Sequence, residues 1–304
     1  MTVSILGLGL VAPGVEDAFR VRTLPELADG SAKRLTRLER MALVAAQRAL
    51  ANEGEMPDLA LVFGTGYGAL AATAEFLDGI ATRGAAFGRP IAFQQSVHHS
   101  PAGQLSILLG SHGPALTMTA REVSGESALK VGMTLLDSGR SDRVLVVAAD
   151  EWTESLAAGY RSFECPQALS LGEGAAAVLL GAVPGALSVE RCTLTAHPCP
   201  VLRFATREQL RPLLLEGASG VGSVSISAAS DEVLKAETWG LADLLPAPAR
   251  FIDSDFGFHA SAGLLRLVAA ATRVQASPVG SACAVHGVAL GGGQSMTVVR
   301  HVRT

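Results

Sequence analysis

Aromatic and charged residues are both scarce in this chain. Phe, Trp and Tyr make up 5% of the 304 residues and charged residues 17%, whereas 49% are hydrophobic. The hydrophobic residues lie in short runs broken by Gly, Pro, Asp and Arg, and no run approaches the roughly 20 residues of a membrane-spanning helix. We therefore expect a large apolar core and no membrane partner. Such chains are typical of compact enzymes, or of subunits whose apolar surface is covered by a partner.

Several signals of other protein classes are also missing. The chain does not start with the charged, apolar and small-residue pattern of a secretory leader, so we expect a cytoplasmic protein. A net charge of −4 without a basic stripe argues against a nucleic-acid partner. The four cysteines (Cys165, Cys192, Cys199 and Cys283) form no CxxC pair, which makes a structural zinc or a disulfide framework unexpected. We expect neither a metal nor a cofactor.

A strand, a tight turn, a helix and a second strand are predicted in the middle of the chain. Residues 117–120 can be extended, small and apolar residues then recur at helical spacing up to Ser138-Gly139, and residues 144–149 are continuously apolar. This pattern predicts a buried helix and a strand covered on both faces. Glu122 lies in the turn, at the positive end of the helix dipole, where chemistry on carbonyls and anions is often sited.

Two glycine-rich turns invite nucleotide-binding interpretations that their spacing does not support. Gly7-x-Gly9 follows an apolar strand, but the third glycine of the dinucleotide fingerprint is missing and Pro13-Gly14 stands where a helix should begin. The glycines within residues 64–68 also follow a strand, but the Walker spacing and its lysine are absent. We interpret the second as a tight strand-to-helix turn.

Three segments are expected to lack regular structure. Residues 93–103 should form a polar loop before a helix, residues 161–170 a second loop, and residues 16–32 an irregular stretch. The first loop contains His98 and His99, which cannot share one helical face because they are adjacent. They are therefore a poor metal pair, and a hydrogen-bonding role in the loop is favoured.

The second part of the chain repeats the style of the first. Strands are predicted at residues 188–195, 222–227, 250–253 and 296–302, and helices at residues 207–216, 232–244 and 262–273. Alternating strands and helices in both parts predict a layered α/β fold with central helices between sheets. We place an N-terminal half at residues 1–183 and a C-terminal half at residues 184–304, within one compact unit.

Several segments together resemble the β-ketoacyl synthases of the thiolase superfamily. They match the family's first strand, its GTG strand-turn, the stretch ending in GP before the nucleophile, the GEGA strand and the GFGGQN turn. The segments are residues 6–11, 59–68, 98–114, 171–176 (LGEGAA) and 289–294 (ALGGGQ). The resemblance is firm over residues 35–180 and looser beyond. It implies a thiolase-like five-layer αβαβα fold of two similar halves, with an abbreviated cap and second half. It also implies a dimer formed through the strand after the nucleophile helix.

The chain departs from this family at its catalytic residues. Counting without gaps between the flanking motifs puts Glu122 where the family has its catalytic cysteine, and a carboxylate cannot hold an acyl chain as a stable thioester. The first catalytic histidine should fall within residues 225–231, which contain none. For the second, His259 is the candidate, displaced by about two residues. Leu290 corresponds to the phenylalanine gate.

A scaffold that lacks the condensing residues resembles the chain-length-factor class, the cysteine-less partner of a type II ketosynthase. Its short form and residues 96–103 are most similar to the short synthase-like subunits of aryl-polyene-type pathways. Such a subunit completes the acyl tunnel of its partner and limits product length in polyketide, polyene or fatty-acid biosynthesis. The resemblance implies a heterodimer with a cysteine-bearing ketosynthase, or a homodimer, that reaches acyl carrier protein through the partner. The tunnel residues it implies are Leu290, Gly291, Gly292 and His98.

Two other functions stay open. A stand-alone acyl-thioester enzyme would use Glu122 as the base for hydrolysis, acyl transfer or decarboxylation, because a carboxylate in an apolar site can have a raised pKa. A scaffold protein without a catalytic partner fits the composition as well. For Glu122 the plainer alternative is a satisfied buried carboxylate, hydrogen-bonded to its turn or paired with Arg121. His259 is then an interior hydrogen-bonded histidine, and Gly291 and Gly292 hold a turn.

Overall fold

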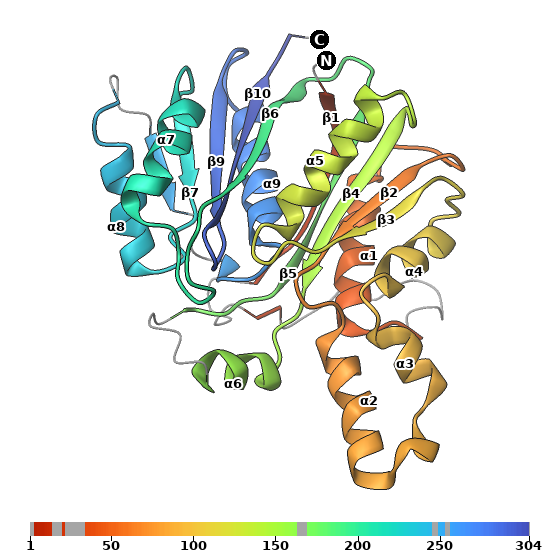
Figure 1. The fold of residues 1–304 in the computed structure, drawn as a ribbon. Coiled ribbons are helices and arrows are strands. Elements are labelled where there is room, and N and C mark those ends of the chain that lie inside the picture. Colours follow the sequence, from red (N-terminus) through yellow and green to blue (C-terminus); the bar gives the residue numbers. More distant parts are fainter. Residues whose placement is uncertain are drawn as a thin grey trace.

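The computed structural model describes residues 3–13, 20–21, 34–162, 169–244, 249–252 and 256–303. Within these residues, ten strands pair into one mixed sheet in the order β3-β2-β4-β5-β1-β6-β10-β9-β7-β8 (Figure 1). The strands are β1 (Val3–Val11), β2 (Ala60–Gly64), β3 (Ala115–Met118), β4 (Arg143–Asp150), β5 (Gly174–Gly181), β6 (Leu187–Ala196), β7 (Ser223–Ile226), β8 (Ala249–Ile252), β9 (Ala282–Val288) and β10 (Gly293–His301).

Helices separate most of these strands along the chain. They are α1 (Arg37–Ala49), α2 (Leu70–Arg83), α3 (Pro90–Ser96), α4 (Ser100–Leu108), α5 (Ser124–Asp137), α6 (Glu154–Ser162), α7 (Arg207–Ala218), α8 (Asp231–Gly240) and α9 (Ala262–Gln275), with a short 3-10 helix η2 (Ala85–Phe87). No helix of the described residues is long and apolar enough to cross a membrane. These residues also contain no cluster of His, Cys, Asp and Glu that could hold a metal ion.

The strand order repeats between the two halves of the sheet. Read from the outer edges inward, β3-β2-β4-β5-β1 and β8-β7-β9-β10-β6 have the same order, each strand being replaced by the one five places later. The halves join where Val3, Ser4 and Ile5 of β1 pair with residues 187–189 of β6. The predicted repetition of two similar α/β halves is therefore confirmed.

Five layers result from how the helices cover this sheet. Helix α1 packs on β1, β4 and β5, while α7 packs on β9 and β10 from the far side of the other half. Between the halves lie α5, which contacts β2, β4 and β6, and α9, which contacts β5, β9 and β10 (Figure 1). The two central helices also contact each other. This is the αβαβα arrangement expected from the sequence.

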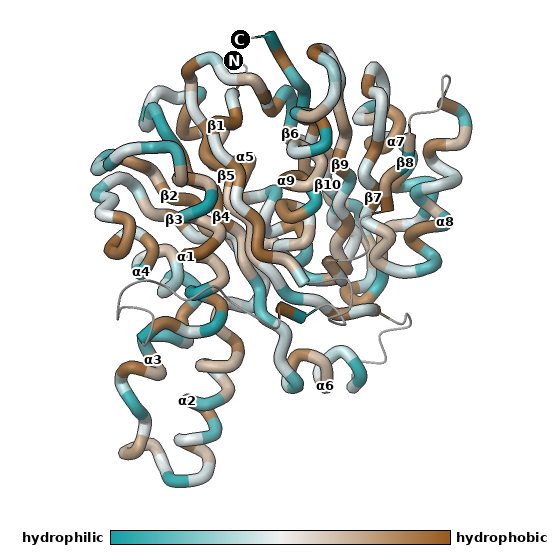
Figure 2. The backbone as a smooth tube through the Cα atoms, turned by 180° about the vertical axis from the view of Figure 1, so that it is seen from behind, coloured by the Kyte–Doolittle hydropathy of each residue, from teal (hydrophilic) through white to brown (hydrophobic). Residues whose placement is uncertain are grey.

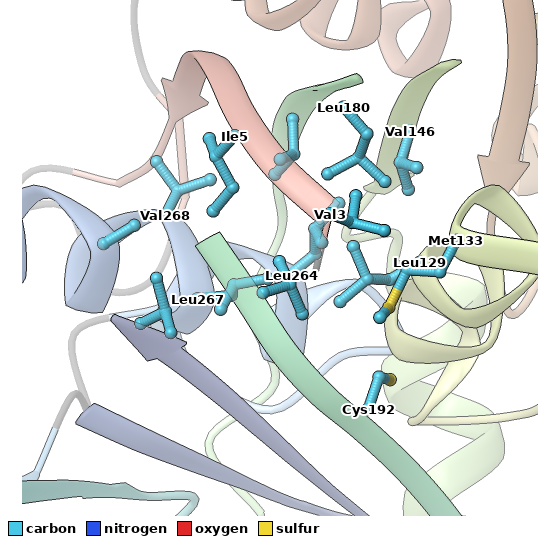
Figure 3. Close-up of a cluster of buried hydrophobic side chains, with 14 of the residues drawn as sticks. Val3, Ile5, Leu129, Met133, Val146, Leu180, Cys192, Leu264, Leu267 and Val268 are labelled. Atoms are coloured by element: carbon cyan, nitrogen blue, oxygen red, sulfur yellow. The ribbon is translucent and has the colours of Figure 1, made fainter. Parts of the chain in front are cut away.

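The main core lies where the central helices meet the strands at the junction of the halves. Side chains of β1, α5 and α9 converge there, among them Val3, Leu129 and Leu264, all fully buried (Figure 3). The hydrophobic stretches of the chain follow these interior strands, and hydrophilic stretches gather in the outer turns (Figure 2). Burying this much apolar surface is the main stabilising contribution to such a fold.

The glycines of the first strand serve helix packing. A Cβ on Gly7 would lie 1.9 Å from the carbonyl oxygen of Ala49, and a Cβ on Gly9 would lie 1.9 Å from that of Ala45. Strand β1 therefore touches the backbone of α1 directly, which only glycine allows at this distance. The Gly7-x-Gly9 pattern is explained by this contact and not by a bound nucleotide.

Two expected loops are partly helical. The prediction of a polar loop over residues 93–103 is wrong at both ends. Helix α3 runs to Ser96 and α4 starts at Ser100, so only residues 97–99 lie between the two helices. Pro90 and Pro101 stand in the first turns of these helices, where proline is tolerated. The loop predicted from residue 161 loses its first two residues to α6.

Other expectations lie at or beyond the limits of the described residues. The stretch predicted to be irregular, the abbreviated cap and the remainder of the second loop fall largely outside them. Strand β9 (Ala282–Val288) was not expected, because its small residues and its histidine give no clear apolar pattern.

The strand after the nucleophile helix does not lie at a surface. Strand β4 pairs with β2 on one edge and β5 on the other, and residues 144–150 are buried between α1 and α5. The expectation of a dimer through this strand is therefore wrong. The end of this half of the sheet is β3, which pairs with β2 alone among the described strands.

Candidate functional site

A strained turn connects β3 to α5. Arg121 has a φ of 52°, in the left-handed region that side-chain-bearing residues rarely adopt. Ser124 fixes the turn: its Oγ accepts a hydrogen bond from the Ala120 N–H at 2.9 Å and donates to the Arg121 carbonyl at 2.6 Å. The turn directs Glu122 into the interior, where the residue is 3% exposed. The predicted elbow is therefore present.

The carboxylate of Glu122 is held by groups from distant parts of the chain. Its Oε2 accepts a hydrogen bond from the backbone N–H of Leu290 at 3.0 Å. Its Oε1 accepts one from the hydroxyl of Tyr160 at 2.9 Å, and the hydroxyl of Tyr67 lies at 3.4 Å. The two hydroxyls are 2.5 Å apart. The predicted partner Arg121 does not bind this carboxylate, because its Nη1 donates to the carbonyl of Val201.

Both tyrosines of the chain meet at this carboxylate. The sequence contains two tyrosines, and they come from the turn after β2 and from α6. Tyr160 donates to Glu122, so Tyr67 is free to donate to the Tyr160 oxygen and complete a short chain of hydrogen bonds. Buried tyrosine hydroxyls usually find such partners. No pattern in the sequence marked either residue.

Burial dominates the ionisation of this cluster. Loss of water raises the pKa of Glu122 above its ordinary value, and the hydrogen bonds from Tyr160, its own amide and the Leu290 amide oppose this only in part. Burial and the nearby carboxylate also raise the pKa of both Tyr67 and Tyr160. The site therefore favours a neutral phenol pair and a carboxyl group that is easier to protonate than an exposed one.

An apolar cavity of about 570 Å³ lies on one side of Glu122. Its walls include Leu70, Leu156, Leu202 and Leu290, and the Glu122 cluster forms its polar part. Cavities of this kind, largely apolar with a few convergent polar groups, are typical ligand sites.

A second, smaller cavity of about 130 Å³ lies on the other side. It is lined by polar residues of the second half, including Ser227, His259 and Arg266. Among the described residues, Glu122 is the one that lines both cavities. Its side chain therefore separates the apolar cavity from the polar one.

His259 lies beside this smaller cavity and not in contact with the Glu122 carboxylate. Its Nδ1 is 2.8 Å from the Ser261 hydroxyl, and its Nε2 has no hydrogen-bond partner within the part of the chain that the structure describes. Burial, helped by the charge of Arg266, lowers the pKa of His259 to about 3. The imidazole is therefore neutral at physiological pH, as in the interior-histidine alternative.

The expected glycine turn is present beside Leu290. Gly291 and Gly292 have φ values of 81° and 87°, so both need the left-handed conformation. The Gly291 N–H donates to the carbonyl of Arg203 at 2.7 Å, which ties the turn to the neighbouring loop. This turn aims the Leu290 amide at Glu122. His98, by contrast, is exposed, packs against Gly68 and lines neither cavity beside Glu122.

Asp150 is a buried acid that the sequence reading overlooked. Its Oδ1 accepts hydrogen bonds from the Thr65 hydroxyl and the Gly66 N–H, both at 2.9 Å, and from the Tyr67 N–H at 3.3 Å. It therefore holds the turn that positions Tyr67. Burial raises the pKa of Asp150 to about 7, against the effect of these hydrogen bonds.

The segment where a catalytic histidine was expected is held by another buried acid. The Glu237 carboxylate accepts hydrogen bonds from the Ser227 and Ala228 amides at 2.8 and 2.9 Å. It also contacts Nδ1 of His286 at 2.6 Å. Burial alone would raise the pKa of Glu237, but His286 and these amides outweigh it and hold the pKa below its ordinary value. This loop therefore presents Ser227, Ala228 and Ala229 to the small cavity.

The chain was then compared with known proteins. The family model described as "Beta-ketoacyl synthase, N-terminal domain" matches residues 12–199, more than half of the chain. A search of the curated proteins gave no match.

Several solved structures share the fold over the full chain. "The ishigamide ketosynthase/chain length factor" is 20% identical with a TM-score of 0.83, and 100% of both chains is covered. A type II PKS acyl-carrier protein in complex with its ketosynthase bound to the hexaketide is 13% identical, with a TM-score of 0.79 and 99% of both chains covered. A β-ketoacyl synthase from Burkholderia phymatum is 14% identical with a TM-score of 0.80, covering 99% of this chain and 100% of that one. Because the family model matches more than half of the chain, the chain belongs to the β-ketoacyl synthase family.

Proposed function

We propose that this chain is a non-condensing, chain-length-factor-type subunit that pairs with a cysteine-bearing ketosynthase. The observation that carries the proposal is the position of Glu122. To carry an acyl group, the residue at this elbow would need a nucleophilic side chain such as a thiol. Glu122 instead has a carboxylate that is hydrogen-bonded to Leu290 and Tyr160. Its carboxylate occupies the Leu290 amide, a donor that would otherwise be free to stabilise a developing oxyanion.

The apolar cavity supports a role in shaping an acyl tunnel. Its volume of about 570 Å³ suits a hydrocarbon chain, and the Glu122 cluster stands at its polar part. Because Glu122 separates it from the polar cavity, an acyl chain entering the apolar side would stop there. We infer that Leu290 and its glycine turn help to set the length that fits.

A sheet edge that no other described strand covers, together with apolar side chains at the surface, supports pairing with another subunit. Strand β3 ends its half of the sheet, and Leu116 in it is 40% exposed. Helix α4 contacts β3, and α3 contacts α4 and α2, so this edge continues into the projecting α2–α3 arm (Figure 1). Exposed apolar side chains lie along it: Leu77, Phe87, Ile91, Phe93 and Ile107. We place the partner contact here, in place of the buried β4.

The neighbouring structures suggest the kind of partner. One of these structures is of a ketosynthase/chain length factor, and another is of an acyl-carrier protein in complex with its ketosynthase. By analogy of fold, we propose a ketosynthase as the partner and an acyl carrier protein as the protein that delivers chains through it. We also propose that the subunit acts in polyketide, polyene or fatty-acid biosynthesis and that it is located in the cytoplasm.

Co-expression with a cysteine-bearing ketosynthase encoded beside this chain tests the proposal. Size-exclusion chromatography with light scattering should give a 1:1 complex, and carrier-protein assays should show condensation that needs the partner's cysteine. Phe93→Asp and Leu116→Asp should prevent the complex, whereas Val279→Asp, at an equally exposed valine elsewhere, should not. A monomer that binds no such ketosynthase, in a chain that remains folded, would refute the proposal.

One observation favours a second function, a stand-alone enzyme on acyl thioesters. Glu122 has a raised pKa beside an apolar cavity, as a general base for hydrolysis or acyl transfer would need. Decarboxylation is the least favoured reaction, because an ionised Glu122 repels a substrate carboxylate. Turnover of acyl-carrier-protein thioesters by the wild type, lost in Glu122→Gln, would support this function. Equal turnover by both proteins, or none by either, would end it.

A further inference from the structure

Three buried polar groups without partners line the small cavity. They are the Nε of Arg266, the Nε2 of His259 and the Oγ of Ser227, and none has a hydrogen-bond partner among the described residues. The three residues are 5%, 4% and 6% exposed. Buried polar groups are nearly always paired, so three open positions around one cavity call for a ligand or water there.

Arg266 carries the strongest part of this argument. It projects from α9 into the interior, and no ion pair of this arginine is present among the described residues. A guanidinium stays ionised in proteins, so burial leaves a positive charge without an opposite charge bound to it. Leaving a buried charge unpaired is strongly destabilising, as is the breaking of a buried ion pair. An anion bound in the cavity would remove this cost.

The acids near Arg266 do not fill this role. Glu126 is close enough for Arg266 to lower its pKa, but its Oε2 has no hydrogen-bond partner among the described residues, and the residue does not line the cavity. Glu122 does line it, but its two oxygens are engaged by Leu290 and Tyr160. Burial raises the pKa of Glu122, and its protonated form does not repel an anion in the cavity. Asp231 lines the rim and is exposed.

The neutral groups complete a donor set for an oxygen anion. The Ser227 hydroxyl can rotate its hydrogen into the cavity. Nδ1 of His259 lies 2.8 Å from the Ser261 hydroxyl, and in the tautomer in which Nδ1 accepts, Nε2 carries the proton and is a donor at the cavity wall. A cation with two neutral donors fits a carboxylate, whose two oxygens can accept from all three.

We propose that the cavity lined by Arg266, His259 and Ser227 binds a short-chain carboxylate anion. Its volume of about 130 Å³ sets the size of the ligand. Since one water takes about 30 Å³ of the liquid, the cavity holds on the order of four waters, which leaves space for acetate or propionate but not for a long acyl chain. This site is separate from the apolar cavity and needs no partner subunit, so it goes beyond the proposed tunnel function.

Fluorine NMR on the purified full chain tests the proposal with trifluoroacetate as the probe. The wild type should broaden the probe signal saturably, and acetate should reverse the effect. Arg266→Met should weaken binding by about tenfold or more, the range for lost hydrogen bonds to a charged group. Arg273→Met removes an arginine from the same helix outside the cavity lining and should bind as the wild type does.

A thermal readout accompanies the titration. Acetate, at matched ionic strength against chloride, should raise the melting temperature of the wild type and of Arg273→Met but not of Arg266→Met. If Arg266→Met does not fold, Ser227→Ala replaces it, and weaker binding by that variant supports the same site. Absence of saturable binding by the wild type would overturn the proposal. So would unchanged binding by a folded Arg266→Met, or displacement of the probe by phosphate but not by acetate.

Discussion

The carboxylate of Glu122 accepts a hydrogen bond from the backbone N–H of Leu290, 3.0 Å away and 168 positions further along the chain. This contact connects the elbow before α5 to the glycine turn before β10, and so joins the two halves at the site. It also gives the carboxylate a structural function, because a buried acceptor and a buried donor satisfy each other. The substitutions below separate this function from any chemistry.

Glu122→Gln should change how stability depends on pH. The pKa of Glu122 is raised in the folded chain, so its protonated form stabilises the fold below the unfolded pKa, and this contribution is lost as pH rises through the folded pKa. The glutamine variant cannot lose a proton. Urea unfolding at several pH values should show that, as the pH rises, the free energy of unfolding of the wild type falls relative to that of Glu122→Gln. Parallel curves would mean that burial does not perturb this carboxyl group.

Tyr160→Phe should weaken the same cluster from the other side. The phenylalanine keeps the ring contact with Phe258 but removes the hydrogen bond to Glu122. A buried acceptor that loses a donor typically costs about 1–3 kcal/mol. Tyr67→Phe, whose hydroxyl lies 3.4 Å from the carboxylate, is the matched control and should cost less. Chemical denaturation measures both, and the reverse order would assign the main contact to Tyr67.

The spacing of sequence motifs was sufficient to find Glu122. The segments before and after the elbow are short and regular, so counting between them reached the right residue. Tyr67 and Tyr160 could not be found in this way, because they come from a turn and a helix whose local patterns carry no sign of a shared target. Arg266 was hidden for a related reason: an arginine within an apolar helix pattern normally indicates the exposed face, and here it points inward.

The sequence predicted the layers of the fold better than it predicted which strands lie at the edges of the sheet. Apolar periodicity identified α5 and α9, because each buries a broad face against strands. It could not show which strand ends the sheet, since an interior strand and an edge strand read alike in a chain this apolar. The dimer contact on β4 was implied by the resemblance, and the apolar pattern of this strand could not show that it lies between β2 and β5. Helix α3 was missed because its apolar side chains, Ile91 and Phe93, face outward.

Asp150→Asn should flatten the pH dependence of stability between the unfolded and folded pKa values of Asp150, 3.8 and about 7. Burial raises the pKa of Asp150 to about 7 from 3.8, so its stabilising protonated form is lost as pH rises between these values. Over that pH range the contribution of Asp150 to the free energy of unfolding changes by about 4 kcal/mol. The asparagine keeps an oxygen for the Thr65 and Gly66 donors. Unfolding curves at pH 5 and 8 should differ less for the variant than for the wild type.

The control for this experiment is Asp142→Asn, which removes a carboxylate from an exposed position. It should reproduce the wild-type pH profile. If Asp142→Asn flattened the profile as much as Asp150→Asn does, the effect would come from net charge and not from the buried group.

Gly9→Ala should destabilise the chain strongly through packing alone. The added Cβ would lie 1.9 Å from the carbonyl oxygen of Ala45 and 2.9 Å from the backbone nitrogen of Ala49, so α1 would have to move away from β1. Overpacking of this kind costs about 3 kcal/mol or more, because backbone atoms cannot rotate aside as side chains can. Gly54→Ala is the matched control: its Cβ would meet nothing within 4 Å, and its effect should stay within about 1 kcal/mol. Denaturant unfolding measures both variants. A Gly9→Ala protein as stable as Gly54→Ala would show that β1 and α1 are further apart than the structure places them, and the glycine pattern of the first strand would then need another explanation.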